Sequence, residues 1–479
     1  MDNSHSEPTN ENTSLVQELN QAKQQIEQLQ NAYNQALSEI ERLEGIISLM
    51  PKDLLQQDLS IDIDTGTRQL RFKMATVMYV DMRGYKTNSN EPRTQSAVDE
   101  LDQIIIHFAE IADSHNLQII KTIGDAFMCV GGIPEKNITN PVDVVMCAME
   151  MVRYTKQMRQ NCGDDNNKFW ELRIGIHTGP VIATMSGKKK FSYDIKGETV
   201  NIATRMAAAA EHDKINVSVY TYELVREYFV TDYNGVTPVK YHGDLEMYYV
   251  RRLRPALSVN KKIGEFPNEI FKIKYALRQF TDLQEFLLDK LERELPKTLY
   301  YHNYKHTIDV VNQAELIGLG EGLDDSDILL LKVAALFHDS GLIIGFDNHE
   351  YYSTQFAREI LPKWHYTDKQ IEKICSIIMA TKLPPKPQNL LEKVICDADL
   401  DYLGRVDFIP ISNTLYEELR ALGKDIDINT WNKKQVAFLS SHQYFTTTAQ
   451  RMREEAKEFQ IERLKKLIVD DGDSTSSQS

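Results

Sequence analysis

The chain has 479 residues, of which 42% are hydrophobic and 26% charged, and it carries a formal net charge of −15 at pH 7. This length exceeds one ordinary hydrophobic core, so we expect a soluble, globular protein with two or more domains. The negative charge argues against broad binding to nucleic acid or anionic membranes, which both need a cationic surface. No run of eighteen apolar residues, no signal peptide and no paired cysteine spacing are found, so we expect a cytoplasmic protein without a transmembrane segment.

A heptad repeat occupies residues 14–50, after a polar segment at 1–13 that we expect to be disordered. Apolar residues recur at alternating spacings of three and four, and Glu, Gln and Lys dominate the other positions. This narrow apolar seam predicts a left-handed coiled coil, because an amphipathic helix lying on its own domain needs a wider stripe. Pro51 predicts the end of the helix and the start of a connector at 51–69.

The rest of the chain divides into a mixed region and a helical region. Strand-like and helix-like stretches alternate from residue 70 to residue 252, which predicts an α/β sheet domain. The segment 253–268 holds two prolines and few large apolar residues, and it is the expected linker. Residues 269–469 show a helical pattern almost throughout and predict an all-α domain, followed by a polar tail at 470–479 that we expect to be disordered. The expected fold class is therefore α+β.

Two aspartates stand at the ends of strand-like stretches in the mixed region. Asp81 follows the apolar run 76–80, and Asp125 lies at the tip of a predicted hairpin at 117–130. Carboxylates at the ends of neighbouring strands can bind Mg²⁺, which shares its remaining ligands with substrate phosphates. The turn at 82–85 leads into a helix, so its free N–H groups can bind phosphate oxygens. If the aspartates share no metal, they are two solvated turn residues.

Asn201 and Arg205 form a second polar pair, on a helix expected at 200–210. They are four residues apart, so they project from the same face of that helix. The guanidinium offers a planar fork for phosphate charge, and the amide can orient a sugar or phosphate oxygen. Lys121 lies on the strand that leads into the turn carrying Asp125.

Four stretches in this order, 79–85, 121–125, 173–180 and 193–205, resemble the catalytic domain of the class III nucleotide cyclases. The resemblance implies a ferredoxin-like α/β fold, and conversion of a nucleoside triphosphate to a cyclic nucleotide and pyrophosphate. Four motifs in the family order are far more specific than a single glycine-rich loop.

The resemblance implies a role for seven residues. Asp81 and Asp125 match the aspartates that hold two Mg²⁺ or Mn²⁺ ions, which help the ribose 3′-hydroxyl lose its proton and stabilise charge on the α-phosphate. Lys121 and Asp194 match the pair that reads adenine, because an ammonium can donate to the ring N1 and a carboxylate can accept from the 6-amino group. Guanine presents the reverse pattern, so ATP is favoured over GTP as the substrate.

The remaining three roles concern the phosphates. Asn201 and Arg205 match the pair that stabilises the transition state, and Lys240 matches a lysine that grips the triphosphate. Lys86 departs from the family, which usually has Thr or Ser at this position after the Gly-aromatic step, and the phosphate loop is expected to differ slightly there.

In this family, one active site is shared across a head-to-tail dimer. One protomer supplies the metal-binding aspartates, and the other supplies the purine-reading and transition-state groups. Because this chain carries both halves, the resemblance predicts a homodimer with two equal sites. The coiled coil at 14–50 would tether the two protomers.

The helical region contains a second set of polar motifs. His338 and Asp339 are adjacent at the end of an apolar helix, where burying both without partners would be costly. A metal ion removes that cost, because it binds neutral imidazole and ionised carboxylate together. His302 and His306 precede this pair, and an Asp-Ala-Asp triplet at 397–399 follows it.

These motifs resemble the HD superfamily of metal-dependent phosphohydrolases. The resemblance implies a divalent transition metal bound by His306, His338, Asp339 and Asp399, with Asp397 as the alternative to Asp399. The start of the motif, His302-Asn303, resembles that of the cyclic-nucleotide phosphodiesterases, in which this histidine protonates the leaving oxygen. The phosphodiesterase continuation is absent, and Asp347-Asn-His-Glu350 stands in its place, as in small bacterial HD proteins of varied substrate.

The sequence favours a homodimeric adenylate cyclase of signal transduction, whose HD domain binds metal and regulates or hydrolyses a phosphoester. In one alternative the main output is HD phosphohydrolase activity, on a cyclic nucleotide for example. In another, the chain is a non-catalytic scaffold that senses nucleotides. The complete set of seven cyclase residues argues against the scaffold.

Overall fold

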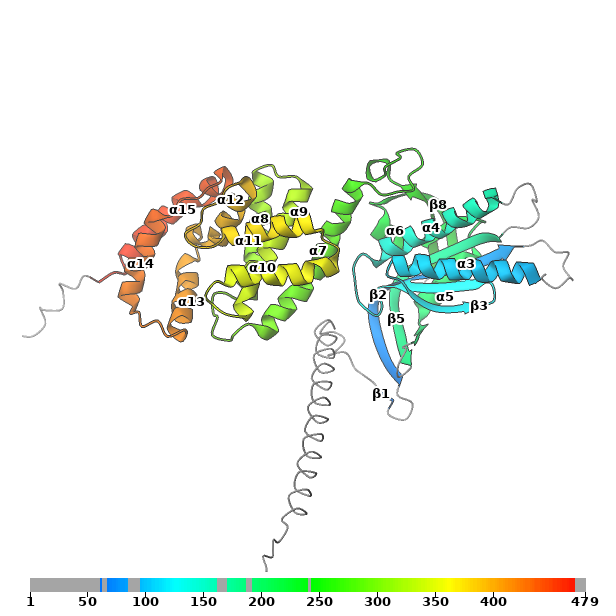
Figure 1. Cartoon of the computed structure of the whole chain (residues 1–479), viewed down its shortest axis with the longest axis horizontal. Helices are drawn as coiled ribbons and strands as arrows, with labels where there is room; N and C mark the ends of the chain where they lie inside the picture. Colours follow the sequence, from blue (N-terminus) through cyan, green and yellow to red (C-terminus); the bar gives the residue numbers. More distant parts are fainter. Residues whose placement is uncertain are drawn as a thin grey trace, which may run out of the picture. The chain divides into compact units, whose positions relative to one another are not determined.

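The computed structural model describes residues 61–62, 67–84, 95–161, 170–186, 192–239 and 243–469. The predicted coiled coil, most of the connector, the polar tail, Lys86 and Lys240 lie outside these ranges. The predicted order of an α/β sheet region followed by an all-helical region is confirmed (Figure 1). Within the described ranges, no helix is both long and apolar enough to span a lipid bilayer.

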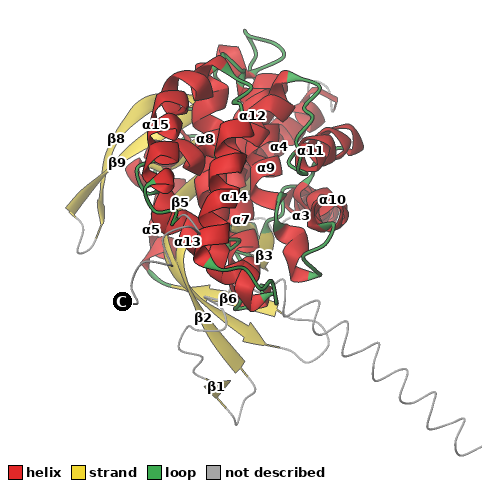
Figure 2. Ribbon diagram, turned by 90° about the vertical axis from the view of Figure 1, so that its left-hand side faces the viewer, coloured by secondary structure: helices red, strands yellow, loops and turns green. Residues whose placement is uncertain are grey.

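A mixed β-sheet is the centre of the first region (Figure 2). Its main path runs in the order β3-β4-β2-β5-β7-β9-β8, with β1 paired to β2 and β6 paired to β5. The β5–β7 pair is parallel, whereas β2–β4, β3–β4, β5–β6, β7–β9 and β8–β9 are antiparallel. The strands are β1 (Ile61–Asp62), β2 (Thr67–Gly84), β3 (Gln118–Ile123), β4 (Ala126–Gly131), β5 (Trp170–Ser186), β6 (Ser192–Lys196), β7 (Lys214–Ser218), β8 (Phe229–Val239) and β9 (Gly243–Leu253).

Helices cover both faces of this sheet. The helices α3 (Gln95–Ser114), α4 (Asn140–Asn161) and α6 (Val219–Val225) share the main core with one face, where Val250 of β9 is buried. The helix α5 (Glu198–Ala208) packs with Leu245 and Met247 in a separate cluster. Because side chains alternate along a strand, Leu245 and Met247 face away from the main core that contains Val250. The helix α5 therefore lies on the opposite face from α3 and α4.

The second region contains nine helices in the described part of the chain. Its core is centred on α9 (Asp325–Phe337), in which nine side chains between Ile328 and Phe337 are buried. A helix that is apolar all round must be surrounded by other helices. Those are α7 (Glu269–Glu294), α8 (Tyr304–Gly320), α10 (His349–Ile360), α11 (Asp368–Ala380) and α12 (Leu390–Asp399). The helices α13 (Phe408–Ala421), α14 (Ile428–Ser441) and α15 (Thr447–Lys465) contribute to a separate apolar cluster, and the short 3-10 helices η2 (Ser340–Ile343), η3 (Leu361–Trp364) and η4 (Asp401–Gly404) lie between the longer ones in sequence.

One helix, α7, belongs to the cores of both regions. Phe271, in its first turn, is buried in the core of the sheet region, whereas Leu283 and Leu287 are buried in the helical core. The segment predicted as a linker, 253–268, contains the 3-10 helix η1 (Pro255–Leu257) and an antiparallel bridge between Ser258 and Pro267. The helix that begins at Glu269 therefore packs with its first turn on the sheet region and with its later turns in the helical core.

Polar contacts reinforce the attachment of α7 to the sheet region. The hydroxyl of Tyr275 donates to Asp143 Oδ1 at 2.7 Å. Burial, above all, raises the pKa of Asp143 to about 7. Asp282 accepts from the backbone N–H of Ile138 at 3.0 Å, and Arg278 donates to the carbonyl of the same residue at 3.2 Å. One acidic and one basic residue of α7, Asp282 and Arg278, therefore both bind the backbone of the loop before α4.

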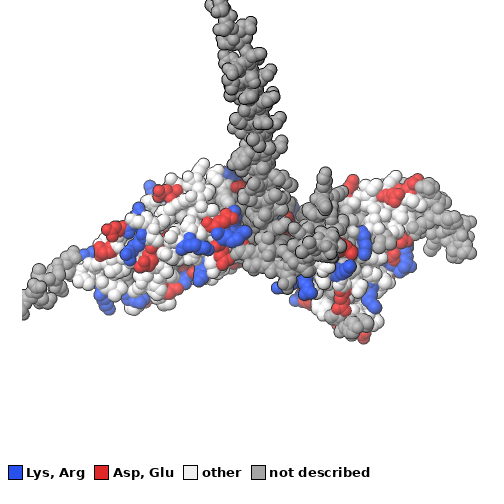
Figure 3. Space-filling view, turned by 90° about the horizontal axis from the view of Figure 1, so that it is seen from below, with Lys and Arg blue, Asp and Glu red and all other residues white. Residues whose placement is uncertain are grey.

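Charged side chains on the described surface are intermixed. On the face seen in Figure 3, lysines and arginines lie among aspartates and glutamates, and the described residues form no broad basic area there. A surface of mixed sign lacks the extended cationic footprint of a nucleic-acid-binding protein.

Candidate active sites

The sheet brings Asp81 and Asp125 next to one another. Asp81 lies opposite Ala126 in the antiparallel β2–β4 ladder, and the N–H of Met82 donates to the carbonyl of Asp125 at 2.8 Å. Both side chains are partly exposed. The pKa of Tyr79 is raised by burial and then by the negative charges of Asp81 and Asp125, so both carboxylates act on the same region. Two hard, accessible carboxylates at neighbouring strand ends fit the ligand preference of Mg²⁺ or Mn²⁺.

Lys121 and Asp194 are exposed on two further strands. Lys121 lies on β3 opposite Met128, and Asp194 lies on β6 opposite Thr184. The strands β3 and β6 contact each other although they share no ladder. Within the described residues, no ion pair joins this lysine to this aspartate. The ammonium and the carboxylate are thus both accessible to a ligand.

Asn201 and Arg205 are carried by α5, which lies unusually close to β5. The reason is Gly175 on β5: a Cβ at this position would overlap the backbone of Ala203 and Ala207. Both Asn201 and Arg205 are exposed, and a guanidinium nitrogen of Arg205, Nη1, donates to the carbonyl of Pro238 at 3.0 Å. Within one chain, Arg205 therefore faces the end of β8. The Asp81 carboxylate accepts a hydrogen bond from a different arginine, Arg83, at 2.9 Å.

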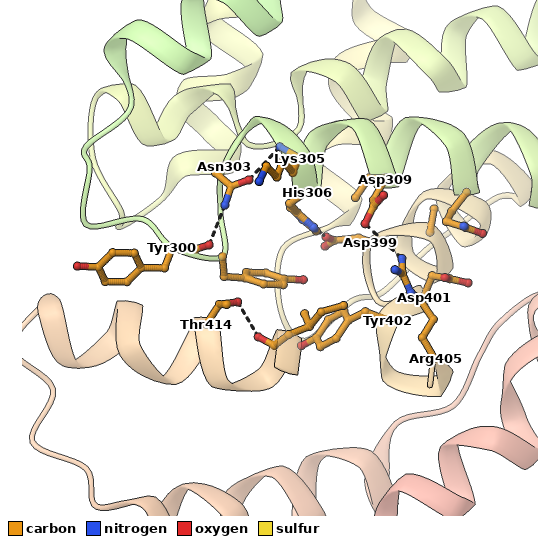
Figure 4. Close-up of a pocket in the computed structure, with 15 residues that line it drawn as sticks. Tyr300, Asn303, Lys305, His306, Asp309, Asp399, Asp401, Tyr402, Arg405 and Thr414 are labelled. Atoms are coloured by element: carbon orange, nitrogen blue, oxygen red, sulfur yellow. Dashed lines mark hydrogen bonds and ion pairs between the residues drawn. The ribbon is translucent and has the colours of Figure 1, made fainter. Parts of the chain in front are cut away.

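A cluster of four side chains forms in the helical region, and Figure 4 shows two of them, His306 and Asp399. His306 comes from α8, His338 and Asp339 follow α9, and Asp399 ends α12. His306 Nε2 lies 3.2 Å from Asp399 Oδ1 and 3.4 Å from His338 Nε2. His338 Nε2 lies 3.2 Å from Asp339 Oδ2. Ligand atoms bound to one cation at about 2.1 Å stand roughly 3.0–3.5 Å apart, so this spacing fits a shared divalent ion.

The chemistry of the donor set also fits a metal ion. His338 Nδ1–H donates to the carbonyl of Ala335 at 2.7 Å, which leaves the lone pair of Nε2 directed at the cluster. Asp339 Oδ2 is buried and has no hydrogen-bond partner among the described residues. Burial raises the pKa of Asp339, but the charges of the neighbouring histidines outweigh it and hold this pKa below its usual range. An ionised, unsatisfied carboxylate beside two imidazoles needs a cation.

The two aspartates of the Asp-Ala-Asp triplet have different surroundings. Asp399 lies in the cluster, 3.2 Å from His306. Asp397 is fully buried and accepts from the backbone N–H groups of Phe445 and Thr446 at 2.9 and 2.8 Å. It also accepts from the Thr446 hydroxyl at 2.7 Å. The structure thus places Asp399 with the histidines, and Asp397 at the start of α15.

His302 is held by a glutamate that the sequence did not single out. The Glu418 side chain is fully buried on α13, and its Oε2 accepts from the N–H groups of Tyr301 and His302 at 2.8 and 3.0 Å. Its other oxygen contacts His302 Nδ1. Burial lowers the pKa of His302, but the hydrogen bond to Glu418 and the nearby carboxylates raise it above its ordinary value. Glu418 is 116 residues from His302 in the sequence, and no sequence motif marks it as a partner of this histidine.

A cavity of about 190 Å³ adjoins the cluster (Figure 4). His306 and Asp399 form part of its wall, and the rings of Tyr301 and Tyr402 form another part. Lys305 stands at the rim and is exposed. The cavity therefore combines a polar wall, aromatic surface and two cationic side chains, Lys305 and Arg405, which suits an organic phosphate.

Among the described residues, the fold and these two sites define an α/β region with paired carboxylates on neighbouring strands, and a helical region with a His/Asp cluster that fits a metal ion. Residues 68–252 match the adenylate and guanylate cyclase catalytic domain, and residues 303–401 match the HD domain. The chain thus carries a class III cyclase catalytic domain followed by an HD domain, as the motifs predicted.

Similar proteins include both adenylate and guanylate cyclases. The chain is 28% identical over 200 residues to "Adenylate cyclase" of Mycobacterium tuberculosis H37Rv, covering 42% of each chain. It is 34% identical over 182 residues to "Guanylyl cyclase, membrane" of Dictyostelium discoideum, covering 37% of this chain and 12% of that protein. The solved adenylyl cyclase CyaB of P. aeruginosa is 28% identical, covers 38% of this chain and 95% of that chain, and has a TM-score of 0.35. The chain thus aligns with less than half the length of either full-length relative.

Proposed function

We propose that the protein is an adenylate cyclase that converts ATP to cyclic AMP and pyrophosphate at sites shared between two protomers. The observation that carries the proposal is the β2–β4 register, which sets Asp81 beside Asp125. Two Mg²⁺ or Mn²⁺ ions held there would promote loss of the 3′-hydroxyl proton and neutralise charge on the triphosphate.

The other half of the site consists of exposed side chains with the required chemistry. Lys121 would donate to adenine N1, and Asp194 would accept from the 6-amino group. Arg205 would exchange its contact with the Pro238 carbonyl for the charge on the α-phosphate, and Asn201 would orient the ribose. Lys240, which directly follows β8, would bind the triphosphate.

The test is a product assay on the purified full chain with Mn²⁺ and either ATP or GTP. Cyclic AMP should form at least about 100-fold faster than cyclic GMP, because a site built for the adenine pattern leaves its polar groups unpaired with guanine. Asp125→Ala should lower the rate roughly a thousandfold, since the metal contributes several kcal/mol of charge stabilisation. Asp113→Ala, an exposed aspartate on α3, is the matched control. Absence of any cyclic nucleotide would refute the activity, and cyclic GMP as main product would refute the base assignment.

We also propose that the HD domain hydrolyses a phosphoester. The favouring observation is the cluster of His306, His338, Asp339 and Asp399 beside a cavity, with His302 fixed by Glu418. In this arrangement, His302 is placed to protonate a leaving oxygen.

Leaving groups of different basicity test this role of His302. In full-length protein carrying Asp125→Ala, which cannot make cyclic AMP, cyclic AMP with Mn²⁺ should yield AMP, and bis(p-nitrophenyl) phosphate should also be cleaved. His302→Gln should slow the first reaction at least about tenfold more than the second, because p-nitrophenolate leaves without a proton. His338→Ala should abolish both. If His302→Gln slows both reactions equally, His302 is not the acid.

A further inference from the structure

The loop that joins β9 to α7, residues 258–268, presents apolar side chains to solvent, and we call it the junction loop. Val259, Ile263 and Phe266 are 71%, 54% and 53% exposed, and Ile270 in the first turn of α7 is 57% exposed. Figure 1 shows this loop at the edge of the sheet region, beside the start of α7. Single exposed apolar residues are common, but four large ones within twelve consecutive residues indicate a contact surface.

Hydrogen bonds hold the junction loop in one shape. The N–H of Val259 donates to the carbonyl of Phe266 at 3.0 Å, so these two residues lie opposite each other across the loop. The N–H of Gly264 donates to the carbonyl of Asn260 at 2.8 Å and closes the tip. Gly264 has a φ of +69°, and a Cβ there would lie 2.8 Å from the carbonyl oxygen of Leu253. Because the loop is already ordered, covering its apolar side chains costs little conformational entropy.

The same segment is basic in an acidic protein. Residues 251–274 contain seven lysines and arginines but two glutamates, whereas the whole chain has a net charge of −15. Three of the seven pair with carboxylates: Arg251 with Asp232, Lys272 with Glu269 and Lys274 with Glu227. The excess positive charge therefore belongs to the other four, Arg252, Arg254, Lys261 and Lys262.

These four cations stand close to the apolar side chains. Lys261 and Lys262 are exposed at the tip of the junction loop. Arg252 donates to the backbone carbonyls of both lysines, and Arg254 donates to the carbonyl of Arg226 at 2.8 Å. Both guanidinium groups thus bind backbone oxygens, which leaves their positive charge available to an anionic partner.

The mixture of apolar and cationic side chains distinguishes between two kinds of partner. The tip reads Val259-Asn-Lys-Lys-Ile263, so that lysines lie directly between the apolar residues. The core of a protein–protein interface is depleted of charged residues, and this tip does not fit that pattern. At a lipid headgroup boundary, by contrast, apolar side chains enter the acyl region while lysines bind the anionic headgroups. The composition therefore favours a lipid surface over an acidic protein.

We propose that the junction loop docks the protein on an anionic membrane surface. Val259, Ile263 and Phe266 enter the headgroup boundary, and Lys261 and Lys262 bind lipid phosphates. The negative net charge of the chain does not oppose this contact, because a membrane surface potential falls off within about 10 Å at 0.1 M salt. Only the charge near the docked loop counts, and that charge is positive. The proposal goes beyond the two enzymatic activities and depends on neither.

Vesicle sedimentation with the full chain tests the electrostatic part of the proposal. At about 0.1 M salt, phosphatidylcholine vesicles with about 30% phosphatidylserine should bind the protein, and pure phosphatidylcholine vesicles should not. Lys261→Gln combined with Lys262→Gln should weaken binding roughly 25-fold, since each cation near an anionic surface contributes about fivefold. Lys433→Gln combined with Lys434→Gln, an adjacent exposed pair on α14, is the matched control and should bind like the wild type.

A second pair of variants tests whether apolar side chains enter the membrane. Ile263→Ser leaves the charge unchanged and should lower binding at least about tenfold. Val406→Ser removes an apolar side chain that is 88% exposed in the helical region, and it should leave binding unchanged. All of these substitutions are at exposed positions, so circular dichroism spectra should match that of the wild type.

Three results would overturn the proposal. The first is no binding to the phosphatidylserine vesicles, or equal weakening by the two lysine pairs. The second is unchanged binding by Ile263→Ser, which would make the contact purely electrostatic. The third is binding of soluble polyglutamate without binding of vesicles, which would assign the junction loop to an acidic protein partner.

Discussion

Mixing Asp81→Ala protein with Asn201→Ala protein should restore cyclase activity that neither variant has alone. The two residues lie in different halves of the proposed site, so a heterodimer keeps one site with both halves intact. If protomers assort at random, half of the dimers are heterodimers with one working site of two, and about a quarter of wild-type activity should return. The measurement is cyclic AMP formation after co-refolding or co-expression of the two variants.

The control pairs two variants of the same half. Asp81→Ala mixed with Asp125→Ala should stay inactive, because every dimer lacks a complete pair of carboxylates in each site. Recovery in this control, or none in the first mixture, would contradict shared sites. Asn201 and Arg205 are exposed on the single chain, so a second protomer can reach them.

Raising the pH from 5 to 8 should weaken the attachment of α7 to the cyclase domain. Burial raises the pKa of Asp143 from 3.8 to about 7, and that of Asp282 from 3.8 to about 6. Because the folded state holds these protons more tightly than the unfolded state, their stabilising contribution is full below pH 4 and is lost as the pH rises through the folded values. For Asp143 the change between pH 5 and pH 8 is on the order of 3 kcal/mol. Urea unfolding across this pH range measures it.

The matched variant is Asp143→Asn, which keeps the shape of a protonated carboxyl group and cannot ionise. It should retain the bond from Tyr275 and show a flatter pH dependence than the wild type, with higher stability at pH 8. The other charged groups that face this region, Asp282 and Arg278, are unchanged in it. An unaltered pH slope in Asp143→Asn would show that Asp143 does not carry the effect.

The sequence was sufficient for the parts of the sites that depend on local pattern. Asp81 follows an apolar run on β2 and Asp125 lies in the tight turn between β3 and β4, so the local position of each could be expected, whereas the pairing of β2 with β4 joins strands on either side of α3. His338 and Asp339 likewise end a helix that is apolar all round, where an unpaired charge demands a partner.

Other features depend on contacts between distant segments, which no periodic pattern encodes. Asp397 and Asp399 are equivalent in sequence, and only the position of Phe445 and Thr446 distinguishes them. Glu418 reads as one of many glutamates on an amphipathic helix, yet its side chain is fully buried under His302.

The helix α7 has a practical consequence for dissecting the protein. The cyclase match ends at residue 252 and the HD match begins at residue 303, so a fragment cut at either family boundary omits α7. A cyclase fragment ending there loses Phe271 and Tyr275, and an HD fragment starting there loses Leu283 and Leu287. Each fragment would expose an apolar groove where the helix had been. Fragments of either half that are made for expression should therefore include α7 in full.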